Sequence, residues 1–381
     1  MLKIGPYNFH RDSIKLSLLI LINNLRTKFF GVPRLKRKGL VAMAKEVLKK
    51  NVNKHLVYAG RGHFRLMWIS DFSVALKGLS KILPSAQIAK ILQFVIDQSI
   101  KRGYTTTSFS LRRALDLPYS RADSFPWLLY AVRQYVSFSG SRKFLRVNND
   151  KLQQLLTSYQ KHFLDKNGLV KISATGDWAD TIKRPSSTWN NLFSLYVAKN
   201  AKGLGLKSQI SWRVCQQRIL ATRFNQKFLT DYADTTMPSV DAPILALYLG
   251  LFEKSIRVRL ANWLDEQSEL LLGVSPARAS YNDYPKTLIP WVNRLMASGY
   301  HSRAHWLHLG LMWANGLKDL NRDYRKIRRS VEKTVRKYKN FIEVVDLKGN
   351  LFRKVLSSEH GFTMSAGQYL ELMTKKVTSG K

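Results

Sequence analysis

Cysteine is nearly absent from the sequence, because Cys215 is the only one among 381 residues. A single cysteine excludes an internal disulfide and any cysteine-rich zinc cluster, and it agrees with a reducing compartment, so we expect a cytoplasmic protein. The chain also lacks a phosphate-cradling glycine loop and a dinucleotide-binding fingerprint, so we expect no organic cofactor. His301 and His305 lie four residues apart, but no third ligand has a fixed spacing to them, and we expect no metal site.

The chain also has no hydrophobic run of membrane-spanning length. The most suggestive segment, residues 16–22 (LSLLILI), is followed by Asn23, Asn24 and Arg26. A spanning helix needs about 20 apolar residues, and a cleavable signal needs a small-residue cleavage site, which does not follow here. We therefore expect a packed N-terminal helix and no transmembrane segment.

Acidic residues are scarce: 63 lysines and arginines face 25 aspartates and glutamates, which gives a formal net charge of +38. Such an excess favours association with nucleic acid, anionic lipid or acidic polymers. The basic residues are spread along the chain, with denser patches at 34–38 and 322–339, and no nucleic-acid-binding motif accompanies them. The second patch fits either the solvated face of a helix or an anion-binding surface.

Hydrophobic residues make up 45% of the chain, which is sufficient for a large core. Their spacing predicts about a dozen amphipathic helices, at residues 40–48, 72–83, 86–100, 125–136, 152–163, 189–198, 208–221, 242–252, 256–272, 289–296, 305–317, 324–338 and 365–373. Alternating strand patterns are scarce, apart from small hairpins or extended loops at 170–173 and 344–352. Paired helices of this kind form either a solenoid or a double ring, and spacing alone does not decide between the two.

No linker-like stretch divides the chain. We therefore expect a single helical domain at residues 40–381. Residues 1–39 are expected to form a basic and apolar helical extension that packs on this domain.

Four connections between the helices have the composition of a sugar site, where aromatic faces stack on pyranose rings and carboxylates bind hydroxyls or exchange protons. In the first, residues 65–72, Asp71 either caps the next helix or contacts a ligand. The second, residues 175–191, packs two carboxylates, two tryptophans and many hydroxyl and amide groups into seventeen residues. Packing alone explains so dense a polar and aromatic loop poorly.

The other two connections lie closer to the C-terminus. Residues 282–306 end in an aromatic and histidine-rich turn, where we expect Trp306 to stack on a sugar and His301 to make polar contacts. Residues 357–369 place Glu359 before the last helix, where an acid either complements the helix dipole or takes part in chemistry. Glu371 lies inside that helix, and we expect it to be structural.

The order of these loops resembles the six-hairpin glycosidases, the (α/α)6-barrel group that contains the glucosidase domain of glycogen-debranching enzymes, glucoamylases, neutral invertases and trehalases. Residues 67–79 (MWISDFSVALKGL) resemble the early W-x-R-D-F loop, and residues 176–191 (GDWADTIKRPSSTWNN) resemble the central D-x-W-x-D loop. Residues 239–252 (SVDAPILALYLGLF) resemble the D-A-x-x-x-A-L-x-L-G helix, and residues 359–372 (EHGFTMSAGQYLEL) resemble the terminal W-S-A-G-x-Y-L-E-A-L segment. The resemblance implies an all-α fold, an (α/α)6 toroid of helical hairpins in a single domain.

The resemblance also implies inverting hydrolysis of an α-linked glucoside or oligosaccharide, in which one carboxylic acid protonates the leaving oxygen and a second carboxylate activates water. Carried over by position, Asp180 would be the general acid and Glu359 the general base, with Asp177 a hydrogen-bonding neighbour or the alternative acid. The residues expected to bind substrate are Arg65, Trp68, Asp71, Asp177, Trp178, Lys183, Arg184, Trp189, Asn190, His301 and Trp306. The carboxyls of an inverting pair stand about 6.5–9.5 Å apart, against about 5–5.5 Å for a retaining pair.

The chain departs from the family pattern in three loops. Ser70 stands where the early loop usually has arginine, which removes a bidentate partner for substrate hydroxyls, and Arg65 could replace it from the previous turn. Phe362 and Met364 stand where tryptophan is common, and residues 300–306 are a reduced form of the Y-H-x-G-x-x-W-P loop. The alternative to an enzyme is a non-catalytic protein that binds an anionic or phosphorylated saccharide, a membrane surface or nucleic acid through its positive surface.

Overall fold

Helices account for most of the chain in the computed structural model, which describes residues 2–4, 7–9, 11–36, 39–111, 113–116, 121–174, 176–273, 277–354 and 357–374. The α-helices in that part of the chain are α1 Arg11–Phe30, α2 Leu40–Asn51, α3 Ile69–Leu79, α4 Ser85–Arg102, α5 Ser124–Ser139, α6 Arg142–Phe163, α7 Thr188–Asn200, α8 Trp212–Arg223, α9 Asp241–Leu249, α10 Lys254–Glu266, α11 Ser268–Leu272, α12 Trp291–Met296, α13 Leu307–Asp319, α14 Arg325–Tyr338 and α15 Thr363–Met373. Two short 3-10 helices are η1 Lys202–Leu204 and η2 Lys286–Leu288.

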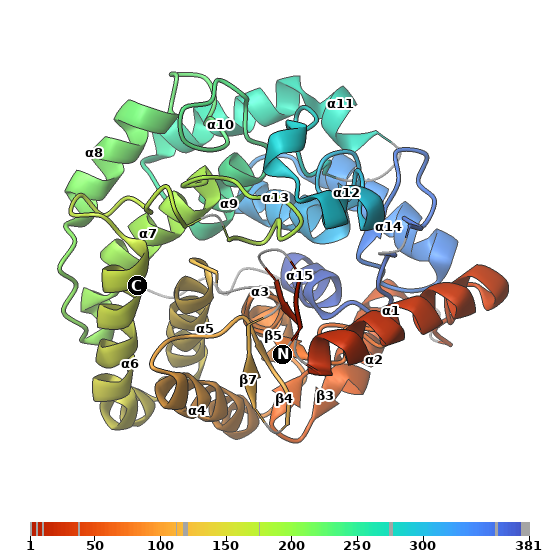
Figure 1. The fold of residues 1–381 in the computed structure, drawn as a ribbon, viewed down its shortest axis with the longest axis horizontal. Coiled ribbons are helices and arrows are strands. Elements are labelled where there is room, and N and C mark those ends of the chain that lie inside the picture. Colours follow the sequence, from red (N-terminus) through yellow and green to blue (C-terminus); the bar gives the residue numbers. More distant parts are fainter. Residues whose placement is uncertain are drawn as a thin grey trace.

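Six helices form a closed inner ring. Helices α3, α5, α7, α9, α13 and α15 contact one another in that order, and α15 returns to α3. Helices α2, α4, α6, α8, α10 and α14 pack against the ring from outside, as Figure 1 shows. Outer and inner helices alternate along the chain, so consecutive pairs form six hairpins. The predicted all-α (α/α)6 toroid is confirmed, and the solenoid is excluded.

The burial of each helix follows its sequence. In α7 every residue from Thr188 to Ala198 is buried, and α13 is buried continuously from Leu307 to Leu317. These inner helices are apolar or small on all sides, as expected for helices enclosed by neighbours. The outer helix α6 instead buries a stripe that includes Leu152, Leu155 and Tyr159 and turns its charged side chains to solvent.

Capping residues set the ends of several helices. Ser141 and Ser187 accept hydrogen bonds from the first turns of α6 and α7, at 3.4 and 3.3 Å. Helix α9 ends at Leu249 because Gly250 adopts a left-handed conformation with φ of 63°. This ending shortens the helix predicted at 242–252. The predicted helix 256–272 is likewise divided at Gln267 into α10 and α11.

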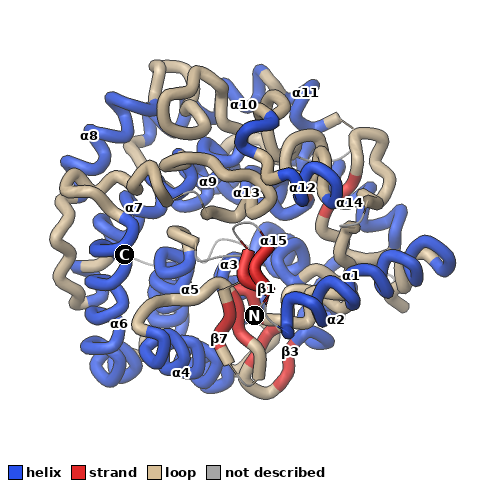
Figure 2. The backbone as a smooth tube through the Cα atoms, in the orientation of Figure 1, coloured by secondary structure: helices blue, strands red, loops and turns tan. Residues whose placement is uncertain are grey.

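The chain also has short strands, coloured red in Figure 2, and some of them join the loops that precede neighbouring inner helices. They are β1 Leu2–Ile4, β2 Tyr7–Phe9, β3 Val52–Asn53, β4 Leu56–Val57, β5 Met67–Trp68, β6 Ser108–Phe109, β7 Ala114–Leu115, β8 His305–Trp306 and β9 Val344–Val345. Strand β5 pairs with β6 and β6 with β7, which links the loops before α3 and α5. Strand β8 pairs with β9, which links the loops before α13 and α15. The predicted helix 305–317 implied that His305 and Trp306 start α13. They instead form β8, and α13 begins at Leu307.

Helices α3 and α15 approach closely through small residues. A Cβ atom built on Gly367 would stand 2.5 Å from the Cβ of Ala75, and one built on Gly78 would stand 2.3 Å from the carbonyl oxygen of Gly367. No side chain fits there unless the two backbones separate.

We expect Gly367→Ala to lower the free energy of unfolding by about 1–3 kcal/mol, because it overpacks this contact. Chemical denaturation monitored by circular dichroism measures the change. Gly203→Ala is the matched control, since a Cβ at Gly203 meets no atom within 4 Å and its φ is not positive. A Gly367→Ala variant as stable as this control would contradict the close contact.

Helix α1 lies at the outside of the ring, beside α2 in Figure 1. Asn23 hydrogen-bonds the ring of His63 at 3.0 Å, and Arg353 donates to the Thr27 carbonyl at 3.1 Å. Residues 16–22 are helical, as predicted, although Leu18, Leu21 and Ile22 are 53%, 53% and 54% exposed. The packing of residues 1–39 on the domain and the division of the chain at residue 39 stay predictions. None of the helices described is long and apolar enough to cross a membrane.

Candidate active site

The loops before the six inner helices meet at one end of the ring, because these helices all run in the same direction. Hydrogen bonds join neighbouring loops there, as between Thr188 and Asp231 and between Thr363 and Ala59. Every predicted site residue lies in one of these loops or in the first turn of an inner helix. The positive ends of the helix dipoles point toward this end and favour negative groups there.

Three carboxyl groups from different loops are linked electrostatically through Asp71, because the charge of Asp180 raises the pKa of Asp71 and the charge of Asp71 raises the pKa of Glu343. Asp71, in the first turn of α3, and Glu343, before β9, are 8% and 4% exposed, and Asp180 is half-buried. Tyr300 donates its hydroxyl hydrogen to Glu343, and the negative charge of Asp180 raises the pKa of Tyr300. We call Asp71, Asp180, Tyr300 and Glu343 the carboxyl cluster.

Burial raises the pKa values of all three carboxyls. The pKa of Asp71 rises to about 7, although the Ser70 hydroxyl and Arg121 oppose the rise. The pKa of Asp180 rises to about 6, with Arg121 lowering it and Asp177 and Asp123 adding to the rise. Burial also raises the pKa of Glu343 well above its usual value. Asp71 and Asp180 therefore exchange protons near neutral pH, as acid–base chemistry requires.

Arg121 is the cation nearest this cluster. It is 5% exposed, and its guanidinium donates to both oxygens of Asp123 at 2.9 and 2.8 Å. Its charge lowers the pKa values of Asp71 and Asp180. Arg121 thus favours the ionised form of those two carboxyls.

Glu359, the predicted base, lies in a nest of backbone N–H groups. Its Oε1 accepts from Gly62 and His360, each at 2.7 Å, and its Oε2 accepts from His63 and Phe64 at 2.8 and 2.7 Å. The residue is 0% exposed. Burial alone would raise the pKa of Glu359, but His63, His360 and the backbone donors lower it below its usual value. The side chain is therefore an ionised group whose lone pairs are all engaged.

Glycines let the chain close around Glu359. A Cβ on Gly60 would stand 2.2 Å from the Cγ of Glu359, and one on Gly62 would stand 2.5 Å from its Oε1. The loop 60–64 therefore encloses this carboxylate only because those positions have no side chain.

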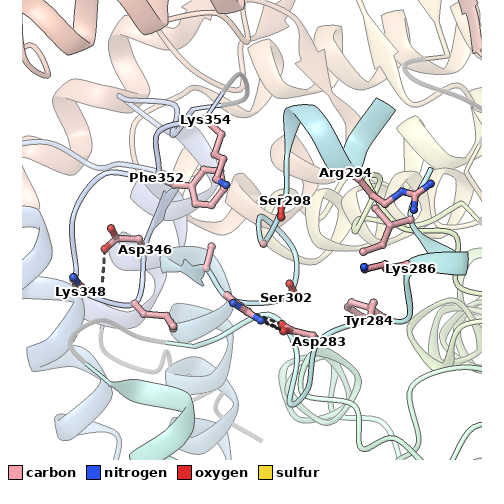
Figure 3. A pocket seen from close by; sticks show the side chains of 15 residues that line it. Asp283, Tyr284, Lys286, Arg294, Ser298, Ser302, Asp346, Lys348, Phe352 and Lys354 are labelled. Atoms are coloured by element: carbon pink, nitrogen blue, oxygen red, sulfur yellow. Dashed lines mark hydrogen bonds and ion pairs between the residues drawn. The ribbon is translucent and has the colours of Figure 1, made fainter. Parts of the chain in front are cut away.

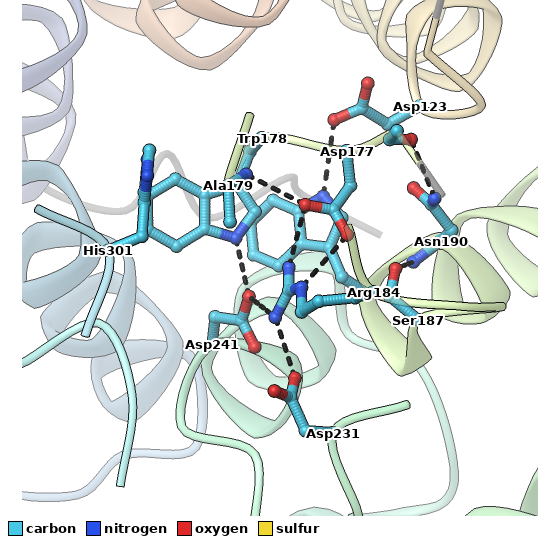
Figure 4. Close-up of polar contacts among 12 residues, drawn as sticks. Asp123, Asp177, Trp178, Ala179, Arg184, Ser187, Asn190, Asp231, Asp241 and His301 are labelled. Carbon is cyan, nitrogen blue, oxygen red and sulfur yellow. Dashed lines mark hydrogen bonds and ion pairs between the residues drawn. The ribbon is translucent and has the colours of Figure 1, made fainter. Parts of the chain in front are cut away.

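Arg184 is the centre of a buried ion network, drawn in Figure 4. Its guanidinium lies 2.9 Å from Asp177, 2.7 Å from Asp231 and 2.8 Å from Asp241, and it is 0% exposed. One cation faces three carboxyls, so burial, together with the charges of Asp241 and Asp177, outweighs Arg184 and raises the pKa of Asp231 to about 7. Asp177 also accepts the N–H of Ala179 at 2.8 Å. The network fixes the loop that carries Asp180.

The predicted aromatic residues pack on one another. The Trp178 indole donates to Asp241 at 2.5 Å, and its ring meets those of Trp189, His301 and Trp306 at 5.7, 5.1 and 5.2 Å. His301 stacks on Trp306 at 4.8 Å. Trp178 is half-buried, whereas the other three are almost fully buried.

The remaining predicted residues differ in exposure. Arg65 is exposed and Lys183 half-buried. Asn190 is buried and donates to the Gly176 carbonyl at 2.9 Å. Trp68 is 8% exposed, and its indole N–H has no hydrogen-bond partner among the described residues. That donor is itself buried.

Glu343 and Arg121 were not among the residues predicted from the sequence. Glu343 lies inside the apolar run of residues 341–345. A carboxylate there is costly to bury unless it has partners, and this was the available signal. Arg121 had no comparable signal in the sequence. Among the described residues, no three histidine, cysteine or acidic side chains group as a metal site would require.

The raised pKa of Asp71 makes a prediction for stability. Unfolded Asp71 ionises near 3.8, whereas the folded group keeps its proton to about 7. Raising the pH from about 4 to about 7 therefore favours unfolding of the wild type, by at most about 1.4 kcal/mol per pH unit for one group. We expect Asp71→Asn to gain stability relative to the wild type over that interval, measured by denaturation at each pH. A constant difference across the interval would show that Asp71 ionises normally in the folded protein.

Among known proteins, similarity to this chain was found in solved structures and not in sequence. No protein-family model matches the chain, and no curated protein matches its sequence. The GH63 mannosylglycerate hydrolase of Thermus thermophilus, in complex with glucose, is similar with a TM-score of 0.63 and 15% identity over 87% of this chain and 99% of that one. A wild-type glycosidase has a TM-score of 0.63 and 12% identity over 95% of this chain and 98% of its own.

A third similar structure is the rhamnosidase from Klebsiella oxytoca with rhamnose bound. Its TM-score is 0.60 at 10% identity, over 89% of this chain and 64% of that one. Identities this low speak for the fold and not for the reaction. Together with the closed ring of six hairpins, they show that the chain has the fold of the six-hairpin glycosidases.

Proposed function

We propose that the protein is a glycosidase that hydrolyses an α-linked glucoside or oligosaccharide with inversion, using Asp180 as general acid and Glu343 as general base. The observation that carries this proposal is the carboxyl cluster, in which three acids from separate loops have raised pKa values, of about 7 for Asp71 and about 6 for Asp180. A six-hairpin ring with such a cluster at the mouth formed by its loops is suited to acid–base hydrolysis.

The reaction requires one protonated and one ionised carboxyl. Burial raises the pKa of Glu343, so its base form depends on the Glu359 N–H and the Tyr300 hydroxyl, which lower that pKa and favour the carboxylate. Asp180 gives its proton to the glycosidic oxygen as the bond to the anomeric carbon breaks. Glu343 takes a proton from a water molecule, which adds to that carbon from the opposite face. The products are a sugar of inverted configuration and the free alcohol, and the proton balance between the two carboxyls is restored through solvent.

Glu343 is preferred to Glu359 as the base because of their hydrogen bonds. Glu359 accepts four backbone N–H groups, so that a water molecule finds no free lone pair on it. Glu343 accepts one backbone N–H, from Glu359 at 3.1 Å, and the Tyr300 hydroxyl. Glu359 would then act as a positioning residue, since its own backbone N–H holds the base.

The other predicted residues divide between substrate contact and support. Trp68, with its free indole N–H, and Asp71 are proposed to bind sugar hydroxyls, and the less buried Arg65 and Lys183 to contact a longer substrate. Arg184 and Asp177 are proposed to hold the loop of Asp180. The supporting role extends to the packed residues Trp189, Asn190, His301 and Trp306, and Trp178 is the aromatic side chain of this group with exposed ring surface.

Asp180→Asn separates the acid from the other roles. We expect it to slow hydrolysis of an unactivated α-glucoside by about 10²–10⁴-fold, because the leaving oxygen is no longer protonated. α-Glucosyl fluoride needs no such proton, and its hydrolysis is expected to change little. Glucose release from both substrates measures the effect, and polarimetry or NMR gives the configuration of the first product. Equal losses on the two substrates would remove Asp180 from the acid role.

Non-catalytic binding is the second candidate function, favoured by the net charge of +38. In that case the protein would bind an anionic saccharide, a membrane surface or nucleic acid without releasing any reducing sugar. Steeply salt-dependent binding to nucleic acid, with no effect of saccharides on thermal stability, would favour this candidate.

A further inference from the structure

A concave site lies beside the loops that carry the carboxyl cluster. Its volume is about 660 Å³, and it is bounded by the segment from Asp283 to Ala304 and by the turn from Asp346 to Lys354 (Figure 3). This volume is in the range of pockets that bind sugar-sized ligands. Asp71 and Arg184 do not line it, but Tyr284, which does, accepts a hydrogen bond from Arg184 at 3.3 Å.

The pocket has an excess of positive charge. Lys286, Arg294, Arg303, Lys348 and Lys354 line it, against Asp283 and Asp346. Arg303 is already bound to Asp283, with its Nε 2.9 and 2.8 Å from the two carboxylate oxygens. The Oδ1 of Asp346 accepts the backbone N–H groups of Lys348 and Asn350 at 2.9 and 2.8 Å.

The other four cations remain without an acidic partner. Lys286, Arg294, Lys348 and Lys354 form no ion pair with any residue described by the structure. They lie on different sides of the pocket, with Arg294 and Lys286 on one side of Figure 3 and Lys348 and Lys354 on the other. An oxyanion bound beside any of them would gain a charge-assisted hydrogen bond that the protein alone does not make.

Both walls of the pocket are attached to the carboxyl cluster. Asn293, in α12, donates to the Thr181 carbonyl at 3.0 Å, and the Lys183 N–H donates to Leu288 at 2.8 Å. These contacts hold one wall against the loop of Asp180. On the other wall, Phe352 packs on Tyr300 with ring centroids 5.2 Å apart, and Tyr300 in turn donates to Glu343.

We propose that this cationic pocket binds an oxyanion carried by the substrate, so that the preferred substrate is a glycoside with a phosphate, sulfate or carboxylate group. This proposal rests on the proposed glycosidase function. The anion holds the far part of the substrate while the glycosidic bond lies at the carboxyl cluster. Binding energy from this remote group then serves to orient the bond that breaks.

Isothermal titration calorimetry with glucose, glucose 6-phosphate, glucose 6-sulfate and glucuronate at physiological salt tests the proposal. We expect at least one of the acidic sugars to bind about tenfold or more tightly than glucose. The phosphate, sulfate and carboxylate probes distinguish the kind of anion. The variant Lys286→Gln/Arg294→Gln is expected to lose that advantage, and Arg329→Gln/Lys333→Gln, which removes two exposed charges from α14, is expected to keep it.

Two outcomes would overturn the proposal: equal affinity for glucose and all acidic sugars, or equal loss in both double variants, which would be a general charge effect. Hydrolysis assays separate this proposal from the proposed function. Cleavage of neutral glucosides with no preference for acidic ones leaves the glycosidase in place and removes the anion subsite. Tight, pocket-dependent binding of an acidic sugar without any cleavage would keep the anion subsite and remove the proposed glycosidase function.

An independent observation concerns the outer face of α1. Leu18, Leu21, Ile22, Leu25 and Phe29 are 53%, 53%, 54%, 49% and 72% exposed, and their spacing places them on one stripe of the helix. We call these five residues the α1 stripe. Helices of soluble domains normally turn such a stripe inward, so its exposure marks an interaction surface.

The inward side of α1 is polar instead. Asn23 and Thr27 are 6% and 4% exposed, and Asn23 contacts the loop that encloses Glu359. The exposed residues Arg26, Lys28, Arg34 and Lys36 surround the stripe or follow it. Two copies of the chain facing each other here would bring charges of +38 together. An anionic surface has the complementary charge.

We infer that the α1 stripe attaches the protein to the surface of an anionic lipid bilayer, with α1 lying in the plane of the interface and its cations at the head groups. Sedimentation with phosphatidylcholine vesicles, with and without phosphatidylglycerol, tests this. We expect binding only to the anionic vesicles, reduced about tenfold or more by Leu21→Ser/Leu25→Ser and unchanged by Val147→Ser, at an exposed apolar position of α6.

Binding that Leu21→Ser/Leu25→Ser leaves unchanged would overturn the inference, because general charge attraction would then suffice. A dimer seen by analytical ultracentrifugation without lipid, and lost in that variant, would also overturn it and assign the stripe to a second copy. Circular dichroism checks that the variant keeps its helical fold.

Discussion

Glu343→Gln is expected to reduce hydrolysis by about 10²–10⁴-fold while the melting temperature changes little. Glutamine has nearly the same shape and keeps an oxygen for the N–H of Glu359 and the hydroxyl of Tyr300. It cannot take a proton from water. Activity on the proposed α-glucoside and thermal unfolding are measured on the same preparation.

Glu359→Gln is the matched comparison, and we expect the opposite result. The amide NH₂ would point at backbone N–H groups that now donate to Oε1 or Oε2. Leaving those donors unsatisfied lowers the free energy of unfolding by about 2–5 kcal/mol.

A third variant separates the two carboxylates further. Sodium azide attacks without a general base, so it should restore turnover to Glu343→Ala by forming a glycosyl azide. It should not restore turnover to Glu359→Ala. A stable but inactive Glu359→Gln protein, beside an active Glu343→Gln protein, would return the base role to Glu359.

Arg184→Met is expected to lower the free energy of unfolding by about 3–5 kcal/mol, because it leaves three buried carboxyls without their cation. Urea denaturation measures the loss. Arg325→Met is the control, since it removes an ion pair whose partners are 66% and 59% exposed, and it should leave the midpoint nearly unchanged.

The loss in Arg184→Met should depend on pH. Arg184 lowers the pKa values of Asp177 and Asp231, so without the guanidinium these values rise in the folded state and protonation stabilises the variant. The deficit should therefore shrink as the pH falls toward about 4. A deficit independent of pH would show that Arg184 acts by packing and not by charge.

The ring of hairpins was predictable because its signals are repetitive. Apolar spacing located the inner and outer helices, and the four ordered segments distinguished the closed ring from a solenoid. Helix ends were less predictable. Gly250 ended α9 before residue 252, and strand pairing with Val344 and Val345 kept His305 and Trp306 out of α13.

The sequence predicted which loops form the site, but not which contacts each side chain makes there. The sequence located Asp180 and Glu359 at the same end of the ring, because each precedes an inner helix. It could not show which carboxylates were already bound, since the donors to Glu359 come from residues 62–64, almost 300 positions away. Arg184 looked like a substrate contact for the same reason: Asp231 and Asp241, which surround it, lie in another loop.

The closure of the ring between α3 and α15 has a consequence for synthesis of the protein. These helices lie at opposite ends of the ring's sequence, and a ribosome completes α15 last. Until then, the apolar flanks of α3 and α13 stay uncovered, and the nest of loop 60–64 waits for its carboxylate. A nascent chain with five hairpins is thus aggregation-prone and inactive, and folding ends in one late, long-range step.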